Sequence, residues 1–307
     1  MRGYYHNPYQ RRNTGEEIKR IFLSDNVMSR LLLINTAVFL FVSAVGVFMW
    51  LFGAAGYNPL VGWLAVPADL SQLAIKPWTV FTYMFLHEGF FHLLFNMVFF
   101  YFGSLLFLEY LSPRKLLQTY IAGGLSGALF FILAFNIFPA FESLRYNAYA
   151  LGASASVLAI FIAIAAYVPD YVVHLFLFGR VKMKYLAIAF VVIDLLSIKS
   201  GNPGGHIAHL GGAFWGGLYA LMLRKGTNPF AWFDRLKMPS VGKKTKYTRF
   251  ETSRPASGRP LNDEEYNRRK AASQEEIDRI LDKIARSGYA SLTKEEKDLL
   301  FHSSKNH

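Results

Sequence analysis

The feature of this sequence that most constrains its fold is a long run with no charged residue, Leu31 to Gly53. A helix needs about 20 apolar residues to cross the hydrocarbon core of a bilayer, and few other structures require such a run. The composition of the chain agrees, because 53% of its 307 residues are hydrophobic and only 18% are charged, against about 25% charged in soluble domains. The sequence therefore predicts a membrane protein with Leu31 to Gly53 as its first span.

Five further runs complete the predicted membrane region. Four of them are long enough to span, and the shorter one that precedes the last contains Asp194; in chain order they are Gly89 to Leu108, Leu116 to Phe141, Tyr146 to Pro169, Tyr185 to Ile198 and Gly201 to Leu223. The segment Ala54 to Phe91 is interrupted by Gly, Pro and Trp, so it is predicted to be a re-entrant or interfacial loop. The predicted fold class is an all-α polytopic membrane protein with six transmembrane helices.

Basic residues flank this membrane region and do not form one patch. Six Lys and Arg lie in the first thirty residues and nineteen in residues 224–307, against eight in the 193 residues between them. The predicted inside loops hold Arg114, Lys115, Arg180, Lys182 and Lys184, whereas each outside loop holds one basic residue: Lys76, Arg145 or Lys199. This positive-inside pattern predicts that both termini are cytoplasmic, and it argues against nucleic acid as a partner. With no cleavable signal peptide apparent, the bacterial cytoplasmic (inner) membrane is favoured.

Four segments are predicted along the chain: a cytoplasmic N-terminal segment 1–30, a membrane domain 31–223, a linker 224–262 and a cytoplasmic helical hairpin 263–307. The linker is rich in Lys, Pro, Gly and Ser. In the tail, Thr293 and Glu296 form a capping-box pattern that opens a last helix, and apolar residues recur before it at helical spacing: Ile277, Ile280, Leu281 and Ile284. The basic tail suits anionic lipid or a partner protein that the sequence does not identify.

Polar residues inside the spans are few, and each is a functional candidate because burying it in a bilayer costs free energy. The chain has no cysteine, so a nucleophile has to be a serine activated by a base such as histidine. Ser154 and His209 each follow a predicted outside loop, which puts both at a similar depth near the outer face. Ser156 and His206 are the alternatives: Ser156 lies about 200° around its helix from Ser154, and His206 shares the helix face of His209.

Small residues surround both candidates. Gly152 and Ala153 precede the serine, and residues four apart line one face of the sixth span: Ala208, Gly212 and Gly216. Such faces let two membrane helices approach closely. His92 and Asn96 share one face of the second span, so both could donate hydrogen bonds to an oxyanion together with the backbone N–H of Ser154.

In this order, His87-x4-His92-x3-Asn96, Gly152-x-Ser154 and Ala208-His209-x2-Gly212-x3-Gly216 resemble the rhomboid intramembrane serine proteases over most of residues 31–223. The run Pro77 to Tyr83 also resembles the sequence that leads into that family's second helix. The resemblance implies a Ser-His dyad without a third acid, in which Ser154 is the nucleophile, His209 the base, and His92 and Asn96 the oxyanion donors. It makes His87, Gly152 and Gly212 structural neighbours of the site. Substrates would be transmembrane proteins, cut in or near a membrane helix amid membrane lipids, and neither cofactor nor metal is predicted.

Two residues depart from the family pattern. Ala155 stands where the nucleophile is usually followed by Gly, and Leu158 stands where an aromatic residue often packs on the base. Neither change removes a reacting group. A catalytically inactive rhomboid-like protein that binds transmembrane clients is therefore the alternative function, and a transporter is a weaker third.

Two other arrangements of polar residues could replace the dyad. Asp194 could orient a histidine as a triad acid does, but its place five residues before Lys199 favours a role near the membrane interface. His87 and His92 are similar to a zinc-binding His pair, yet their five-residue spacing turns them about 140° apart on a helix. The sequence therefore predicts catalysis without a metal and without this acid.

Overall fold

The structure is a computed structural model, and it describes residues 26–54, 58–175, 179–199, 201–231, 276–280, 282–284 and 289–305. The chain divides into two compact units, residues 1–248 and 249–307, which are described separately. The predicted N-terminal segment up to residue 25 and the linker from residue 232 lie outside the described residues.

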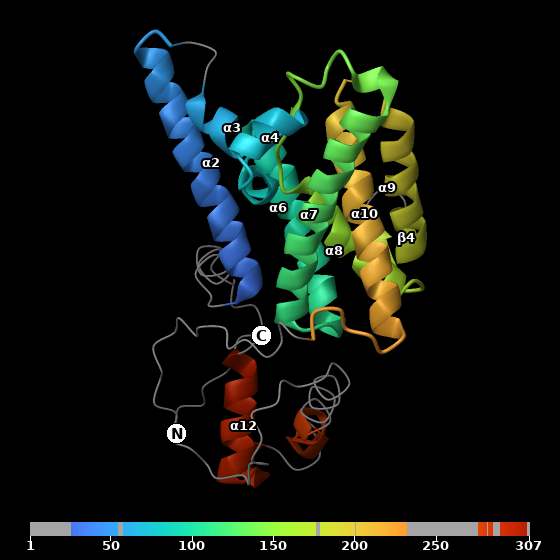
Figure 1. The fold of residues 1–307 in the computed structure, drawn as a ribbon. Coiled ribbons are helices and arrows are strands. Elements are labelled where there is room, and N and C mark those ends of the chain that lie inside the picture. Colours follow the sequence, from blue (N-terminus) through green and yellow to red (C-terminus); the bar gives the residue numbers. More distant parts are fainter. Residues whose placement is uncertain are drawn as a thin grey trace. The chain divides into compact units, whose positions relative to one another are not determined.

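The first unit is a helical bundle, in which each predicted span corresponds to one helix (Figure 1). These helices are α2 (Val27–Leu51), α6 (Phe90–Tyr110), α7 (Pro113–Ile137), α8 (Ser154–Tyr167), α9 (Met183–Ser197) and α10 (Pro203–Arg224). Within the described part of the chain, α2, α6 and α7 are long and apolar enough to cross a membrane, and α8 is a shorter apolar helix. The chain is thus a mostly helical integral membrane protein, whereas six crossings remain a prediction.

Helix α8 begins later than the uncharged run Tyr146 to Pro169 predicts, and it has 14 residues. Two residues of this run, Tyr149–Ala150, instead form strand β2, which pairs antiparallel with β1 (Val66–Pro67). Gly152 then turns the chain with a φ of +127°, a conformation that costs glycine little and other residues much. The charged residues on either side of an uncharged run give the length of that run. They do not indicate at which residue the helix inside it begins.

Helix α8 is the core of the bundle. Most of its residues are buried, and it packs against α6, α7, α9 and α10. A Cβ atom added at Gly212 would lie 2.1 Å from the carbonyl oxygen of Ala155, and one added at Gly216 would lie 2.2 Å from that of Ala159. The prediction of a small-residue face on the sixth span is confirmed, because α10 approaches α8 at distances that only glycine permits.

The segment between α2 and α6 does not form one continuous helix, in agreement with its Gly, Pro and Trp content, and it contains a series of short helices. They are α3 (Pro59–Leu64), α4 (Leu70–Ile75), α5 (Thr79–Thr82) and the 3-10 helix η1 (Tyr83–Phe85). Thr82 Oγ1 donates to the carbonyl oxygen of Leu64 at 2.8 Å, and the backbone N–H of Gly152 donates to that of Tyr83 at 2.9 Å. This loop is therefore joined to the turn that precedes α8. Its re-entrant position in the membrane remains a prediction.

A β-hairpin joins α8 to α9, formed by β3 (Val172–Leu175) and β4 (Gly179–Lys182). Its first strand comes from the short apolar stretch that follows Asp170. At its base Asp170 pairs with Lys184 at 2.9 Å and with Lys182 at 3.0 Å. These two ammonium groups lower the pKa of the exposed Asp170 carboxyl to about 2.

The second unit contains helical residues 276–280 and 282–284, the 3-10 helix η4 (Tyr289–Ser291) and helix α12 (Lys294–Lys305). The predicted capping box is confirmed: the Thr293 N–H donates to Glu296 Oε2 at 2.7 Å, and the Glu296 N–H donates to Thr293 Oγ1 at 3.3 Å. Lys283 also pairs with Glu296 at 2.8 Å. This ion pair joins the helical residues 282–284 to helix α12.

Candidate active site

A cavity of about 220 Å³ is lined by residues of α6, α8, α9 and α10. Its walls are mostly apolar, and four polar side chains line it: Asn96, Ser154, Asp194 and His209. Each comes from a different helix, so the fold brings together residues that are far apart in the sequence. The proposed nucleophile, the proposed base and one proposed oxyanion donor face the same space.

Ser154 is the first residue of α8 and is partly exposed. Gly152 lies close to both the His92 ring and the serine hydroxyl, because a Cβ atom at Gly152 would lie 3.0 Å from His92 Nε2 and 3.6 Å from Ser154 Oγ. Gly152 therefore serves two purposes: it adopts a positive φ, and it leaves room for the His92 imidazole next to the nucleophile.

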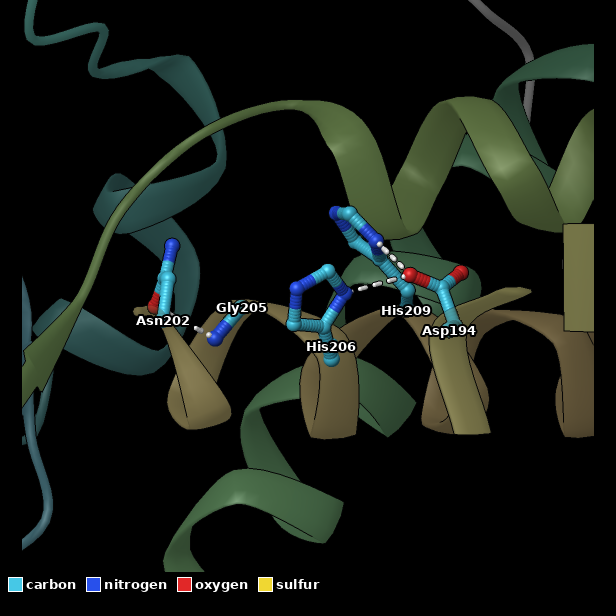
Figure 2. Close-up of polar contacts among 5 residues, drawn as sticks. All are labelled: Asp194, Asn202, Gly205, His206 and His209. Carbon is cyan, nitrogen blue, oxygen red and sulfur yellow. Dashed lines mark hydrogen bonds and ion pairs between the residues drawn. The ribbon is translucent and has the colours of Figure 1, made fainter. Parts of the chain in front are cut away.

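His209 lies in the second turn of α10, whose start is fixed by Asn202. The Asn202 side chain accepts a hydrogen bond of 2.9 Å from the N–H of Gly205 (Figure 2). His209 Nδ1 lies 2.9 Å from Asp194 Oδ1 on α9. An ionised carboxylate can only accept hydrogen bonds, so Nδ1 carries the proton. In the neutral imidazole this leaves Nε2 of His209 unprotonated and able to accept a proton.

Asp194 has a different environment from the interfacial one that the sequence favours. Its side chain is only 9% exposed, and one of its oxygens accepts from both His206 Nδ1 at 2.8 Å and His209 Nδ1 at 2.9 Å (Figure 2). The distance to Lys199 along the chain indicates depth, but it does not indicate which helix the carboxylate faces. An acid inside an apolar run requires a partner, and that requirement is the signal that could have linked Asp194 to the two histidines.

His206 is placed less favourably as a base than His209. Its ring lies 6.0 Å from that of His209 at an interplanar angle of 87°, and its Nδ1 also binds Asp194. Among the described residues, His209 is the one histidine that lines the Ser154 cavity. His206 instead provides a second hydrogen bond to the carboxylate.

The two proposed oxyanion donors lie on successive turns of α6. Asn96 lines the cavity, and its amide nitrogen donates to the backbone oxygen of His92 at 2.9 Å. The His92 ring packs edge-on against that of His87, with centroids 5.1 Å apart, and His87 is buried at 4% exposure. The His92 ring thus contacts the buried His87 ring and lies close to Gly152.

Two residues that follow Ser154, namely Ala155 and Ser156, face away from the cavity. Ser156 is fully buried, and its hydroxyl lies 2.6 Å from the position that a Cβ atom of Gly124 on α7 would take. The methyl group of Ala155 likewise faces Gly127 on α7, at 2.6 Å from an added Cβ atom. Ala155 therefore leaves the cavity open, whereas Leu158, the other departure from the family pattern, lines it.

Asp194, His206 and His209 are also a candidate metal site, because each offers a ligand atom and these atoms lie within 4.8 Å of one another. Both Nδ1 atoms are at hydrogen-bonding distance from the same Asp194 oxygen. A metal ligand has to be a deprotonated nitrogen, whereas the hydrogen bonds require protonated ones. We interpret this group as hydrogen-bonded.

Comparison with known proteins gives two family matches. Residues 75–226 match the Rhomboid domain, and residues 262–306 match a family of unknown function (DUF6576). The chain is 30% identical over 157 residues to RHOMBOID-like protein 12, mitochondrial, of Arabidopsis thaliana, which covers 48% of this chain and 47% of that protein. The chain thus spans about half the length of this curated relative. Every candidate site residue lies inside the Rhomboid match.

Proposed function

The chain belongs to the rhomboid family, and from this premise we propose that it is an intramembrane serine endopeptidase that cleaves transmembrane proteins in or near their membrane helices. The observation that carries the proposal is the single cavity that Ser154 and His209 line together. Packing alone does not require a serine and a histidine to face one space. A general base within reach of a serine is what nucleophilic catalysis does require.

In the proposed reaction, Ser154 Oγ attacks the scissile carbonyl carbon while its proton passes to His209 Nε2. The negative charge then develops on the carbonyl oxygen, where Asn96, His92 and the Ser154 N–H can donate hydrogen bonds. When this intermediate collapses, the C–N bond breaks and His209 gives its proton to the leaving amine. Water attacks the resulting acyl-enzyme and releases the second product.

The length of α8 supports a site below the membrane surface. Its 14 residues extend about 21 Å at 1.5 Å per residue, less than the hydrocarbon core of about 30 Å. The surrounding helices cover α8, so its short length exposes little backbone to lipid. Ser154, at the first turn, would then lie at a depth where water enters from the outer face.

A larger apolar cleft supports lateral approach of a membrane substrate. It has a volume of about 800 Å³ and lies along α6, α9 and the β3–β4 hairpin. Phe99, Phe161 and Phe190 line both this cleft and the Ser154 cavity. The Phe190 ring packs edge-on against both other rings, at 5.8 Å from Phe99 and 5.1 Å from Phe161. Movement of Phe190 would join the two spaces.

We propose six crossings with both termini on the cytoplasmic side, on the evidence of the loop charges. The sequence favours a bacterial cytoplasmic membrane, whereas the Arabidopsis thaliana relative is named as a mitochondrial protein. Transmembrane substrates and lipid contacts are part of the proposal. The partner of the tail is not assigned.

The function is tested by cleavage of a reporter transmembrane substrate in reconstituted vesicles, with purified wild-type protein, Ser154→Ala, His209→Ala and Ser156→Ala. We expect cleavage by wild type and Ser156→Ala, and a loss of about 10⁴-fold or more for the two dyad variants. All four should show the same thermal unfolding temperature. Cleavage by Ser154→Ala at the wild-type rate would refute the proposal, and binding of the reporter without cleavage by wild type would favour the client-binding alternative.

A further inference from the structure

The carboxylate of Asp194 is the one acidic group that lines the Ser154 cavity among the described residues. It projects from α9 toward α10, where His206 and His209 lie one helical turn apart (Figure 2). A single oxygen, Oδ1, accepts a hydrogen bond from Nδ1 of each ring. The acid therefore contacts the proposed base at the ring nitrogen that does not take the serine proton.

Burying the Asp194 carboxylate costs free energy unless hydrogen-bond partners compensate for the lost hydration. Between the first turn of α9 and its last residue, Ser197, Asp194 is the one residue that is not apolar, and a carboxylate inside such a helix is strongly destabilising without compensating partners. A neutral amide or hydroxyl could have bound one imidazole N–H at lower cost. An ionised carboxylate, by contrast, can only accept a hydrogen bond, and so it determines which nitrogen carries the proton.

Resting on the proposed function, we propose that Asp194 is a positioning residue that holds His209 in the Nδ1–H tautomer, so that the Ser154–His209 pair works as a triad with this acid. Free imidazole exchanges between two neutral tautomers, and only the form with a bare Nε2 can accept the Ser154 proton. The carboxylate also faces the positive charge that His209 acquires during the reaction. His206 holds the same oxygen from the preceding turn and restricts the rotation of the Asp194 side chain.

The tautomer can be measured independently of activity. Full-length protein with ¹⁵N-labelled histidine is studied by NMR at a pH of about 8, where ordinary imidazoles are neutral, and His209→Gln identifies the His209 signals among the eight histidines. We expect wild-type His209 to show a protonated Nδ1 and an unprotonated Nε2. In Asp194→Asn this tautomer should no longer be fixed, because an amide can present either an acceptor or a donor to Nδ1. A wild-type His209 protonated on Nε2 would overturn the proposal whether or not Asp194→Asn folds.

Kinetics give the second readout. Asp194→Asn should lower kcat by up to about 10⁴-fold, the loss that follows when the acid of a Ser-His-Asp triad is neutralised, and leave KM within about twofold because substrate contacts remain. Asp194→Glu keeps the charge, so it should recover more activity than Asp194→Asn. The matched control is Asp170→Asn, the same chemical change at the base of the hairpin, where the ion pairs of Asp170 lie outside the cavity; it should retain the wild-type kcat.

The outcomes separate this proposal from the proposed function. Absence of Ser154-dependent cleavage in wild type would refute the proposed protease function. The NMR measurement would still show whether Asp194 fixes the tautomer of His209. Wild-type kcat in folded Asp194→Asn would refute the positioning role and leave a Ser-His dyad. Activity that is lost on chelation and restored by Zn²⁺ would also overturn the proposal, because the same three side chains would then bind a metal.

Discussion

Asp194, His206 and His209 illustrate how single side chains organise this site. Two imidazole N–H groups converge on one carboxylate oxygen, so neither ring can rotate without losing a hydrogen bond in a largely apolar setting. Hydrogen bonds to a charged group are worth about twice as much as neutral ones. The orientation of His209 is thus set by α9, although the residue itself belongs to α10.

Asn96 offers a prediction about the oxyanion donors. Replacing it in Asn96→Ala removes an N–H donor from the cavity, so kcat should fall by about 10²- to 10³-fold with little change in KM. The matched control is Asn136→Ala, because Asn136 donates to the backbone oxygens of Ala68 and Ile132 and does not line the cavity. Asn136→Ala should lower the unfolding temperature and leave kcat close to the wild-type value. Equal kcat values for the two variants would count against Asn96 as a donor.

The residues of the site were within reach of the sequence because membrane spans contain so few polar groups. Ser154, His209 and Asn96 could be selected by type and depth, and they do line one cavity. The contact of Asp194 with His209 could be raised from the sequence as an alternative, because a buried acid requires a partner, but it could not be selected, since it depends on the rotation of α9 about its axis. A run that is apolar on all sides carries no periodic signal of which face meets α10.

Among the elements, the packing of α10 on α8 determines where the base meets the nucleophile. The sequence predicted this contact well, because small residues four apart indicate a close helix pair. It predicted the start of α8 poorly, because the strand pairing of Tyr149 and Ala150 with the loop depends on contacts across the chain. The consequence is functional: the late start puts Ser154 at the first turn of a short helix.

Gly212 provides the test of this packing. In Gly212→Ala the new methyl group would meet the Ala155 backbone at 2.1 Å, so the helices must separate, and we expect a loss of about 1–3 kcal/mol or more in unfolding free energy together with reduced activity. Gly217→Ala is the matched control on α10, since its nearest contact would be an ordinary 3.8 Å to Ile162. Its stability should change by no more than about 1 kcal/mol. Equal stability of the two variants in detergent unfolding would contradict the close approach.

At the scale of the whole molecule, the account predicts that six helices cross the membrane. The chain has no cysteine, so single cysteines can be introduced without background labelling. In sealed vesicles, an impermeant maleimide should label Ser143→Cys and Lys199→Cys from one side, and Ser112→Cys and Arg180→Cys from the other. This result follows from six crossings and the loop charges. Labelling of Ser143→Cys and Arg180→Cys from the same side would exclude α8 as a crossing.

The central claim is that Ser154 is a nucleophile activated by His209, and its most direct measurement requires no substrate. The purified full-length protein is treated with a fluorophosphonate, which reacts with activated serines, and the modified residue is located by peptide mass spectrometry. We expect a single adduct on Ser154, absent from Ser154→Ala and formed much more slowly in His209→Ala. An adduct on Ser156, or labelling that is unchanged in His209→Ala, would contradict the claim.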